Sequence, residues 1–397
     1  MRVAFHAPLK GPTHPAPSGD RRMARQFIAA LQYAGHDVEV ASSLRSFEGD
    51  GLPEHQTAIR ISAETEAENI IKQIRSGSRA DRPDVWFTYH LYYKAPDWIG
   101  PIVCASLGLA YVVAEASYAP KRANGAWASG HDAVANALRA ADAVIALTQR
   151  DMPCVQPLLN DRAKQFYLPP FLDTESDSSS GPEKGTRGRS RSSFAKRHGL
   201  DIDKHWLLTV AMMRAGDKLD SYRLLARASA ALPGDDWQLV IVGDGEVRAD
   251  VEAAFSSLGL ASEGGRIAWT GELPDSALPD IYDSCDVFVW PAVNEAFGMA
   301  LLEAQAAGLP LVAGNEGGVS DVMCDGTTGL LVDSSNPEEF AAAVRGLLDD
   351  AMQRKEFGSR GKTFVRQERS LPQASTIVNE AVMHAYGTRH LDASRAP

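Results

Sequence analysis

The sequence predicts an α/β protein built from two doubly wound parallel sheets. Apolar runs of strand length alternate with helix-like segments along most of the 397-residue chain, and this alternation indicates parallel sheets covered by helices. The alternation stops once, in the Ser-, Gly- and charge-rich segment 173–199, and then resumes. A chain of this length exceeds one ordinary core, so we expect one domain on each side of that segment.

Six apolar runs predict an N-terminal domain over residues 1–172, and they cover residues 2–7, 37–42, 84–90, 110–115, 143–148 and 165–170. Six more predict a C-terminal domain over residues 200–370, and they cover residues 205–212, 237–243, 266–271, 286–291, 310–314 and 329–333. Doubly wound sheets bind ligands beyond the carboxyl ends of their strands. We therefore expect the two domains to face each other across a central cleft that holds the site.

Two segments lie outside these domains. Residues 173–199 have the composition of a solvated linker or surface insertion, although their basic second half also fits a patch that binds a partner. Residues 371–397 contain a final helical pattern and a tail. Packing of that helix back on the N-terminal domain is one arrangement that this pattern allows.

The composition narrows the class of protein. A net charge of −11 argues against a nucleic-acid partner. The four cysteines are scattered and show no C-x-x-C spacing, so neither a metal site nor a disulfide framework is indicated. The N-terminus lacks the apolar core of a signal peptide, and no apolar run approaches the ~18 residues of a membrane span. We expect a cytoplasmic protein, and its oligomeric state stays open.

Arg214 and Lys218 follow directly on the candidate strand 205–212, at its carboxyl end. Two cations four residues apart at this position are suited to neutralise a diphosphate without a metal ion. A nearby helix start opposes them electrostatically, so a negative group beside them would relieve the repulsion. The alternative is an ordinary solvated pair next to Asp217 and Asp220, and these residues alone do not decide between the two.

The segment "VIVGDGEVRAD" (240–250) resembles a phosphate-binding loop only loosely. Its glycines fit a tight turn between a strand and a helix, and Gly243 is a candidate contact to a bound ligand. A full dinucleotide fingerprint would need another glycine where Arg248 stands. An NAD site is therefore rejected here.

Glu295 and Glu303 stand eight residues apart in the apolar stretch "NEAFGMALLEAQAAGLPLVAGNEGG". A helix beginning near Gly298 would offer the amides of Phe297, Gly298 and Met299 to a phosphate. The carboxylate of Glu303 then suits the paired hydroxyls of a ribose, and Glu295, in the loop, suits the hydroxyls of a sugar. The alternative is a cap at Glu295 and a salt-bridged core residue at Glu303, because a buried carboxylate needs a partner.

With these motifs in this order, residues of about 205–335 resemble the nucleotide-sugar domain of retaining family-4 glycosyltransferases of the GT-B fold. The matching parts include Arg214 with Lys218, the segment "VIVGDGE" and the E-x7-E pair Glu295 and Glu303. The resemblance implies that the arginine and lysine bind the donor diphosphate. It also implies that the second glutamate binds the ribose, that the first lies at the donor sugar, and that no metal ion or cofactor is obligatory.

The N-terminal domain matches the family less closely. Where the family has a glycine-rich loop after the first strand, Gly19 at a helix start is the candidate for backbone contact with the donor. Arg21 and Arg22 crowd the first turn of that helix, where the helix dipole disfavours them, so we expect an anionic group of donor or acceptor nearby. The alternatives are a solvated basic face capped by Asp20 and weak contact of this basic helix with an anionic membrane surface.

Acceptor contacts are less sharply defined by the sequence. Many family members have a histidine after the fourth strand, and this chain has Glu115 in that region. His90 ends another candidate strand at its carboxyl end. Both residues are candidates for contact with the acceptor, although a structural or simply exposed histidine is the alternative. No general base is assigned, because the family's same-face displacement lets the leaving phosphate accept the proton.

The sequence therefore predicts a retaining hexosyltransferase, with Arg214, Lys218 and Glu295 as its catalytic residues. Its donor would be a UDP- or GDP-sugar, and its hydroxyl acceptor a glycan, a lipid-linked molecule or a small molecule. The alternatives are a GT-B nucleotide-sugar epimerase or sugar-phosphate synthase, and a catalytically silent protein that binds a nucleotide sugar. The donor sugar, the acceptor and the linkage stay open.

Overall fold

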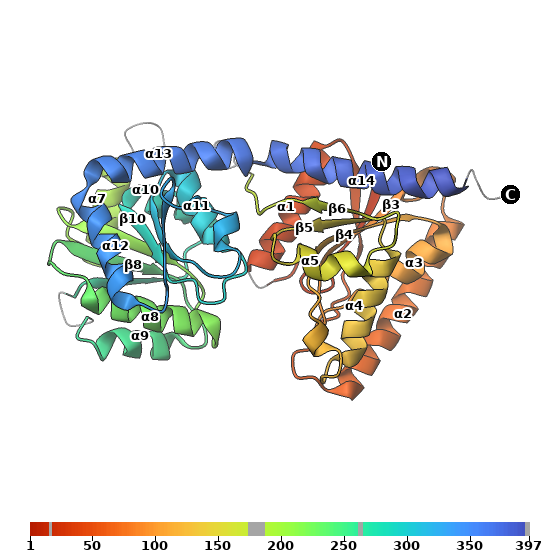
Figure 1. The fold of residues 1–397 in the computed structure, drawn as a ribbon, viewed down its shortest axis with the longest axis horizontal. Helices are drawn as coiled ribbons and strands as arrows, with labels where there is room; N and C mark the ends of the chain where they lie inside the picture. Colours follow the sequence, from red (N-terminus) through yellow and green to blue (C-terminus); the bar gives the residue numbers. More distant parts are fainter. Residues whose placement is uncertain (16–17, 174–186, 261–264, 394–397) are drawn as a thin grey trace. The chain divides into compact units, whose positions relative to one another are not determined.

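The computed structural model describes residues 1–15, 18–173, 187–260 and 265–393. The chain divides into two compact units (Figure 1). Unit 1 comprises Met1–Pro170 together with Leu371–Pro397, and unit 2 comprises Phe171–Ser370. Each unit contains one six-stranded parallel sheet with helices packed on it.

The sheet of unit 1 has the strand order β2-β1-β3-β4-β5-β6, and its strands are β1 (Arg2–His6), β2 (Asp37–Ser42), β3 (Val85–Leu91), β4 (Ala110–Ala116), β5 (Ala143–Ala146) and β6 (Lys164–Tyr167). Its helices are α1 (Gly19–Tyr33), α2 (Pro53–Ser76), α3 (Gly100–Leu107), α4 (Ala128–Ala140), α5 (Met152–Val155) and α14 (Leu371–Ala393), with the short 3-10 turns η1 (Arg79–Asp81), η2 (Pro120–Arg122) and η3 (Gln156–Leu158). The strand order reverses between β1 and β3. In doubly wound sheets this switch point is where ligands bind.

The sheet of unit 2 has the order β12-β11-β10-β7-β8-β9, and its strands are β7 (His205–Val210), β8 (Trp237–Val242), β9 (Ile267–Gly271), β10 (Val287–Trp290), β11 (Leu311–Gly314) and β12 (Gly329–Val332). Its helices are α7 (Arg187–His198), α8 (Asp217–Ala231), α9 (Arg248–Ser256), α10 (Leu278–Ser284), α11 (Met299–Ala307), α12 (Pro337–Asp349) and α13 (Ala351–Glu368), with the turns η4 (Asp275–Ala277) and η5 (Val319–Asp321). Here the order reverses between β7 and β10. The segments that leave these two strands therefore emerge side by side.

The predicted α/β class is confirmed, because each of the twelve predicted strands is present and both sheets are parallel. The central strands are buried along most of their length, and β8 and β10 are buried throughout. Strands covered by helices on both faces need apolar residues on both faces. That requirement is why they appear in the sequence as continuous apolar runs and not as alternating patterns.

The predicted linker 173–199 is in part a helix. Residues 174–186 lie outside the described residues, whereas Arg187–His198 form α7 of unit 2. The guanidinium of Arg191 donates to the backbone carbonyl of Ser284, lies 3.1 Å from Oδ2 of Asp286 and stacks over the ring of Trp206 at 4.1 Å. This arginine, which contributed to the basic charge of the segment, therefore fixes α7 to the core of unit 2.

Helix α14 packs in unit 1 against α1 and against the strands β4, β5 and β6 (Figure 1). The guanidinium of Arg389 donates from Nε to Oδ2 of Asp142 at 2.8 Å, and the same oxygen accepts the backbone N–H of Tyr111. Asp142 is fully buried, whereas Arg389 is partly exposed. Near the other end of the helix, Oδ1 of Asn379 lies 3.1 Å from Nε2 of His36. The Arg389–Asp142 pair therefore joins the C-terminal helix to the start of β5 and, through the backbone of Tyr111, to β4.

We expect the substitution Arg389→Ala to destabilise unit 1 by about 2–4 kcal/mol, because it leaves the buried carboxylate of Asp142 without its cation. Hydrogen exchange of the full chain, followed by mass spectrometry, should show reduced protection in residues 371–390. The matched control is Arg139→Ala, since Arg139 is exposed and, among the described residues, its side chain is assigned a hydrogen bond to Asn136 on its own helix and no other. Equal protection in the two variants would contradict the anchoring role of Arg389.

Candidate active site

The first predicted pair of cations lies where β7 leads into α8, at the switch point of unit 2. Arg214 is exposed, and Lys218, in the first turn of α8, is mostly buried. Among the described residues, no hydrogen bond or ion pair is assigned to the guanidinium of Arg214. A cation without an internal partner at the carboxyl end of a strand is available to an anionic ligand.

The loop after β7 is packed tightly against the loop after β8, and Gly243 permits this contact. Gly243 has a φ of 145°, and a Cβ atom placed on it would lie 1.9 Å from the carbonyl oxygen of Ala211. The loops are joined by backbone hydrogen bonds from Ala211 to Val242 and from Met213 to Asp244. The close approach that Gly243 permits is therefore made to the loop that leads to Arg214, and the predicted donor contact at Gly243 stays a prediction. Gly243 thus shapes the segment that presents this arginine.

Glu295 lies in the loop between β10 and α11, whose backbone conformation is unusual. Ala292 and Asn294 have φ values of 59° and 52°, in the left-handed region that residues other than glycine seldom adopt. Such strained backbone clusters at functional sites. Gly317 packs against this loop, and a Cβ atom on it would lie 1.8 Å from the carbonyl oxygen of Glu295. The hydroxyl of Ser221 in α8 accepts the N–H of Val293 at 3.0 Å.

The carboxylate of Glu295 forms an ion pair with Lys218. Its Oε2 atom accepts a hydrogen bond from Nζ of Lys218 and another from Nε1 of Trp290, the latter at 3.1 Å. The side chains of Lys218 and Glu295 are only 18% and 14% exposed. The structure thus brings two of the three predicted catalytic residues into direct contact. The alternative reading of Glu295 as a helix cap is not supported, since Gly298 occupies the N-cap of α11 and no side chain caps it.

Glu303 lies in α11 and is partly exposed, although its helix neighbours Leu302 and Ala304 are buried. Its Oε2 atom accepts a hydrogen bond from the hydroxyl of Tyr282 at 2.9 Å. Tyr282 belongs to α10 and is itself buried. A carboxylate has about four lone-pair sites, so a neutral hydroxyl at one oxygen leaves it able to accept hydrogen bonds from a ligand.

The start of α11 has the features of an anion site. Gly298 adopts a φ of 73°, and α11 follows from Met299. In the described part of the chain, no acceptor is assigned to the backbone amides of Phe297, Gly298 and Met299. Unpaired amides at a helix N-terminus, together with the helix dipole, favour negative charge. These three amides lie between Glu295 and Glu303 in the sequence, as predicted.

The basic start of α1 in unit 1 has a different cap from the one in the alternative interpretation, and the predicted anionic group near Arg21 and Arg22 stays a prediction. Ser18 caps this helix by accepting the N–H of Arg21, so Asp20 is not the cap. The guanidinium of Arg21 donates to the carbonyl oxygens of His14 and Pro15, at 3.0 and 3.2 Å. Its charge is thus directed at the preceding loop. Arg22 is partly exposed in the same helix turn.

Gly19 is the first residue of α1, and an added Cβ atom would meet nothing within 4 Å. The backbone conformation of this residue therefore does not itself require glycine. A role for Gly19 would have to come from a ligand that approaches its backbone. The prediction of donor contact at Gly19 stays a prediction.

His90 and Glu115 end the neighbouring strands β3 and β4 and lie next to each other. Both have positive φ values, 58° and 55°. Nδ1 of His90 lies 3.1 Å from Oδ1 of Asp20 and 3.5 Å from Oε1 of Glu115. Burial lowers the pKa of His90, but the negative charges of Glu115, Asp20 and Asp151 outweigh burial and raise the pKa to about 9. Burial raises the pKa of Glu115, although His90 opposes this.

The two acceptor candidates therefore form one cluster with Asp20, at the switch point of unit 1. At neutral pH, His90 is an imidazolium ion within a group of carboxylates. An imidazolium donates hydrogen bonds and cannot accept a proton. The carboxylates of the cluster offer hydrogen-bond acceptors to hydroxyl or amino groups, and the raised pKa of His90 disfavours this residue as a general base at neutral pH.

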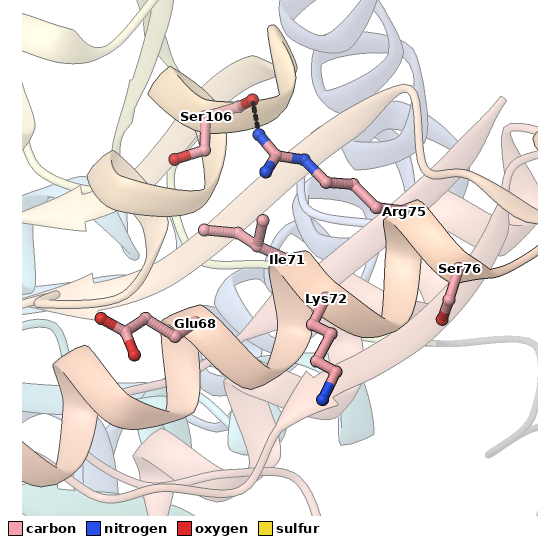
Figure 2. A pocket seen from close by; sticks show the side chains of 6 residues that line it. All are labelled: Glu68, Ile71, Lys72, Arg75, Ser76 and Ser106. Atoms are coloured by element: carbon pink, nitrogen blue, oxygen red, sulfur yellow. Dashed lines mark hydrogen bonds between the residues drawn. The ribbon is translucent and has the colours of Figure 1, made fainter.

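Other parts of the described chain show fewer features of a binding site. A surface depression along α2, near the end of α3, is lined by Glu68, Ile71, Lys72, Arg75, Ser76 and Ser106 (Figure 2). Arg75 spans it and donates to the carbonyl of Ser106 at 3.0 Å. None of the predicted site residues lines this depression. In the same described ranges, no group of three or more His, Cys, Asp or Glu side chains is placed to hold a metal ion, and no helix is long and apolar enough to cross a membrane.

Two doubly wound Rossmann-like units in one chain define the GT-B class, and comparison with solved structures supports this. Sucrose-phosphate synthase from Thermosynechococcus elongatus superposes with a TM-score of 0.70 at 18% identity, over 99% of this chain and 100% of that one. The Anabaena protein HepE in complex with UDP gives a TM-score of 0.69 at 16% identity, over 96% and 99%. The predicted GT-B fold is thereby confirmed. At these identities the likeness establishes the fold alone.

Residues 203–364 match the family described as "Glycosyl transferases group 1". The alpha-D-kanosaminyltransferase of Streptomyces kanamyceticus is 30% identical over 62% of this chain and 60% of its own length. The D-inositol 3-phosphate glycosyltransferase of Corynebacterium diphtheriae is 34% identical over 44% and 42%. The chain thus aligns with about half of the length of these relatives. Unit 2 carries a glycosyl transferases group 1 domain, as the sequence resemblance implied.

Arg214, Lys218, Glu295 and Glu303 all lie inside the matched segment, whereas His90 and Glu115 lie outside it. Sequence reasoning missed two residues that contact the predicted ones, Trp290 and Tyr282. Trp290 ends β10 immediately before the site loop, a position that could have drawn attention to it. Nothing in the sequence indicated that the hydroxyl of Tyr282 would meet Glu303.

The raised pKa of His90 leads to a test of its protonation state. A histidine whose pKa rises from 6.5 to about 9 on folding stabilises the protein fully below about pH 6.5, and this stabilisation is lost as the pH rises through 9. We expect the stability difference between wild type and His90→Gln to shrink over this window in chemical denaturation. The control is His55→Gln, at an exposed histidine of α2. A difference that is independent of pH would contradict the imidazolium assignment.

Proposed function

We propose that this protein is a retaining glycosyltransferase that moves a hexose from a nucleoside diphosphate sugar to a hydroxyl acceptor. The observation that carries the proposal is the arrangement at the switch point of unit 2. There Lys218, four residues after Arg214, forms an ion pair with Glu295. The backbone amides at the start of α11 follow Glu295 in the chain, and among the described residues no acceptor is assigned to them. The cations and the amides fit the phosphates of one donor molecule. The two carboxylates fit its sugar and its ribose.

Arg214, Lys218 and the amides that begin α11 are assigned to the diphosphate. When the bond between the sugar and the diphosphate breaks, negative charge grows on the leaving phosphate oxygen. Preorganised cations and N–H groups lower the energy of that state. Two side-chain cations and a helix terminus can supply the positive charge for which other enzymes use a metal ion. We therefore infer a reaction that does not depend on a metal.

Glu303 is assigned to the ribose hydroxyls. The hydroxyl of Tyr282 orients the Glu303 carboxylate by donating to Oε2 at 2.9 Å. A carboxylate held in this way can accept both hydroxyls of a ribose. Its place in α11 puts it in the same helix whose N-terminus is assigned to the phosphates.

Glu295 is assigned to the donor sugar, next to the bond that breaks. Because Lys218 is assigned to the phosphate and contacts Glu295 directly, the bond between the anomeric carbon and the phosphate oxygen would lie at their contact. In the proposed step this bond breaks, and its electron pair stays with the diphosphate. The acceptor oxygen bonds to the same face of the anomeric carbon, and its proton passes to the leaving phosphate oxygen.

The donor is proposed to be a UDP- or GDP-sugar. The HepE structures hold UDP or UDP-glucose, and one relative, from Mycolicibacterium smegmatis, is described as a GDP-mannose-dependent mannosyltransferase. The named acceptors of other relatives include 2-deoxystreptamine and D-inositol 3-phosphate. Around His90, carboxylates outnumber the imidazolium, so this cluster favours an acceptor that presents hydroxyl or amino groups there over one that presents a phosphate.

The donor site is tested by thermal unfolding in the presence of UDP-, GDP- and ADP-sugars and the free nucleotides, each with and without EDTA. We expect one nucleotide series to raise the unfolding temperature, with no effect of EDTA. A ligand at 100 times its dissociation constant adds about 2.7 kcal/mol to stability, which is well resolved by this method. The absence of a shift with every compound would count against a nucleotide-sugar site.

The residue assignments are tested by kinetics with the donor that the panel selects. We expect Lys218→Ala to lower kcat/KM by an amount equivalent to ~2–4 kcal/mol, because it removes charge at the leaving phosphate. Glu303→Ala should mainly weaken donor binding, and Glu295→Ala should mainly lower kcat. Arg223→Ala is the matched control, since Arg223 is an exposed cation of α8 that pairs with Asp220. Wild-type kinetics in the three site variants would refute the assignments.

A further inference from the structure

Trp290 contacts both charged residues at the centre of the proposed donor site. It is the last residue of β10 and only 3% exposed. Its indole N–H donates to Oε2 of Glu295 at 3.1 Å, the same oxygen that pairs with Lys218. Nζ of Lys218 lies 5.3 Å from the centre of its ring, within the range of a cation–π interaction. One rigid side chain thus holds the carboxylate through a hydrogen bond and the ammonium through its ring face.

Trp290 is itself fixed by its neighbours. The ring of Tyr222, in α8, meets it edge to face, with the centroids 5.1 Å apart. The hydroxyl of Tyr222 donates to the carbonyl oxygen of Ala211 at 2.6 Å. Ala211 begins the loop that carries Arg214. A chain of contacts therefore runs from the loop after β7, through Tyr222 and Trp290, to the loop that carries Glu295.

A buried tryptophan elsewhere in unit 2 shows that these contacts are not a general property of the core. Trp206 is also fully buried, donates its indole N–H and stacks with a cation. Its partners are the backbone carbonyl of Asp201 and the guanidinium of Arg191, neither of which belongs to the proposed site. The two tryptophans make matched kinds of contact, and they differ in whether those contacts reach the site.

We propose that Trp290 is a positioning residue that holds Glu295 and Lys218 in register for the reaction; this inference rests on the proposed function. A bound diphosphate would compete with Glu295 for Lys218. The indole N–H keeps the carboxylate in place when the lysine turns toward the phosphate. Without the indole, Glu295 would follow the lysine or rotate away, and the sugar would lose its alignment. Small displacements of this kind strongly reduce the rate of a reaction.

The test is the substitution Trp290→Phe in the full chain, which keeps an aromatic ring and removes the N–H donor. We expect kcat to fall by about 10- to 100-fold, the effect of losing a hydrogen bond to a charged group. The KM for the donor and the affinity for the free nucleoside diphosphate should stay within about two-fold. Trp206→Phe is the control and should keep wild-type kcat. A kcat in Trp290→Phe equal to that of Trp206→Phe would overturn the proposal.

A double-mutant cycle shows whether Trp290 acts through Glu295. In the Glu295→Ala background, we expect Trp290→Phe to cause little further loss, because the group that it positions is already absent. A further 10- to 100-fold loss would overturn the proposal. Should Trp290→Phe fail to fold, Trp290→Tyr provides the same comparison, since its hydroxyl does not occupy the position of the indole nitrogen. If the wild type transfers sugar and Trp290→Phe matches it, only the positioning role fails; if the wild type binds no nucleotide sugar, the proposed function itself fails.

Discussion

The ion pair between Lys218 and Glu295 joins the segments that leave β7 and β10, the two strands at which the order of the unit 2 sheet reverses. Lys218 sits in the first turn of α8, and Glu295 sits in a loop with two strained residues. The loop keeps this conformation because Gly317 packs without a side chain against its backbone. The amides before α11 follow directly on the same loop, so the geometry of the proposed phosphate site and that of the proposed sugar site both depend on this contact.

Much of this arrangement could be predicted from the sequence, for a physical reason. Parallel strands covered on both faces must be apolar throughout, so the central strands were visible as short apolar runs, whereas the edge strands β2 and β6 are more polar and more exposed. The rule that ligands bind at the carboxyl ends of such strands then selected Arg214 and Glu295 as site residues. The sequence also predicted that a helix begins near Gly298. In the structure this glycine has a positive φ and is the N-cap of α11. These features are encoded within a few neighbouring residues.

The remaining features depend on contacts between residues far apart in the chain. Lys218 and Glu295 are separated by 77 residues, and no local pattern showed that they would neutralise each other. The arginine at position 21 looked available for an anion, but it is directed at loop carbonyls whose orientation the sequence does not reveal. His90 looked like an ordinary strand-end histidine. Its charge state follows from Asp20 and Glu115, which belong to other elements of unit 1.

The charge of His90 bears on how the acceptor loses its proton. Because its pKa is raised to about 9, the protonated form of His90 is favoured at neutral pH, and this form cannot take up a proton. Glu115, beside it, is a carboxylate whose pKa is raised by burial, which makes it a better proton acceptor than an ordinary glutamate, although its ion pair with His90 opposes this. In the proposed same-face reaction, the oxygen of the departing diphosphate gains negative charge as the acceptor oxygen becomes acidic. In this proposal the leaving group therefore supplies the base at the moment when one is needed, and no side chain of unit 1 has to accept the proton.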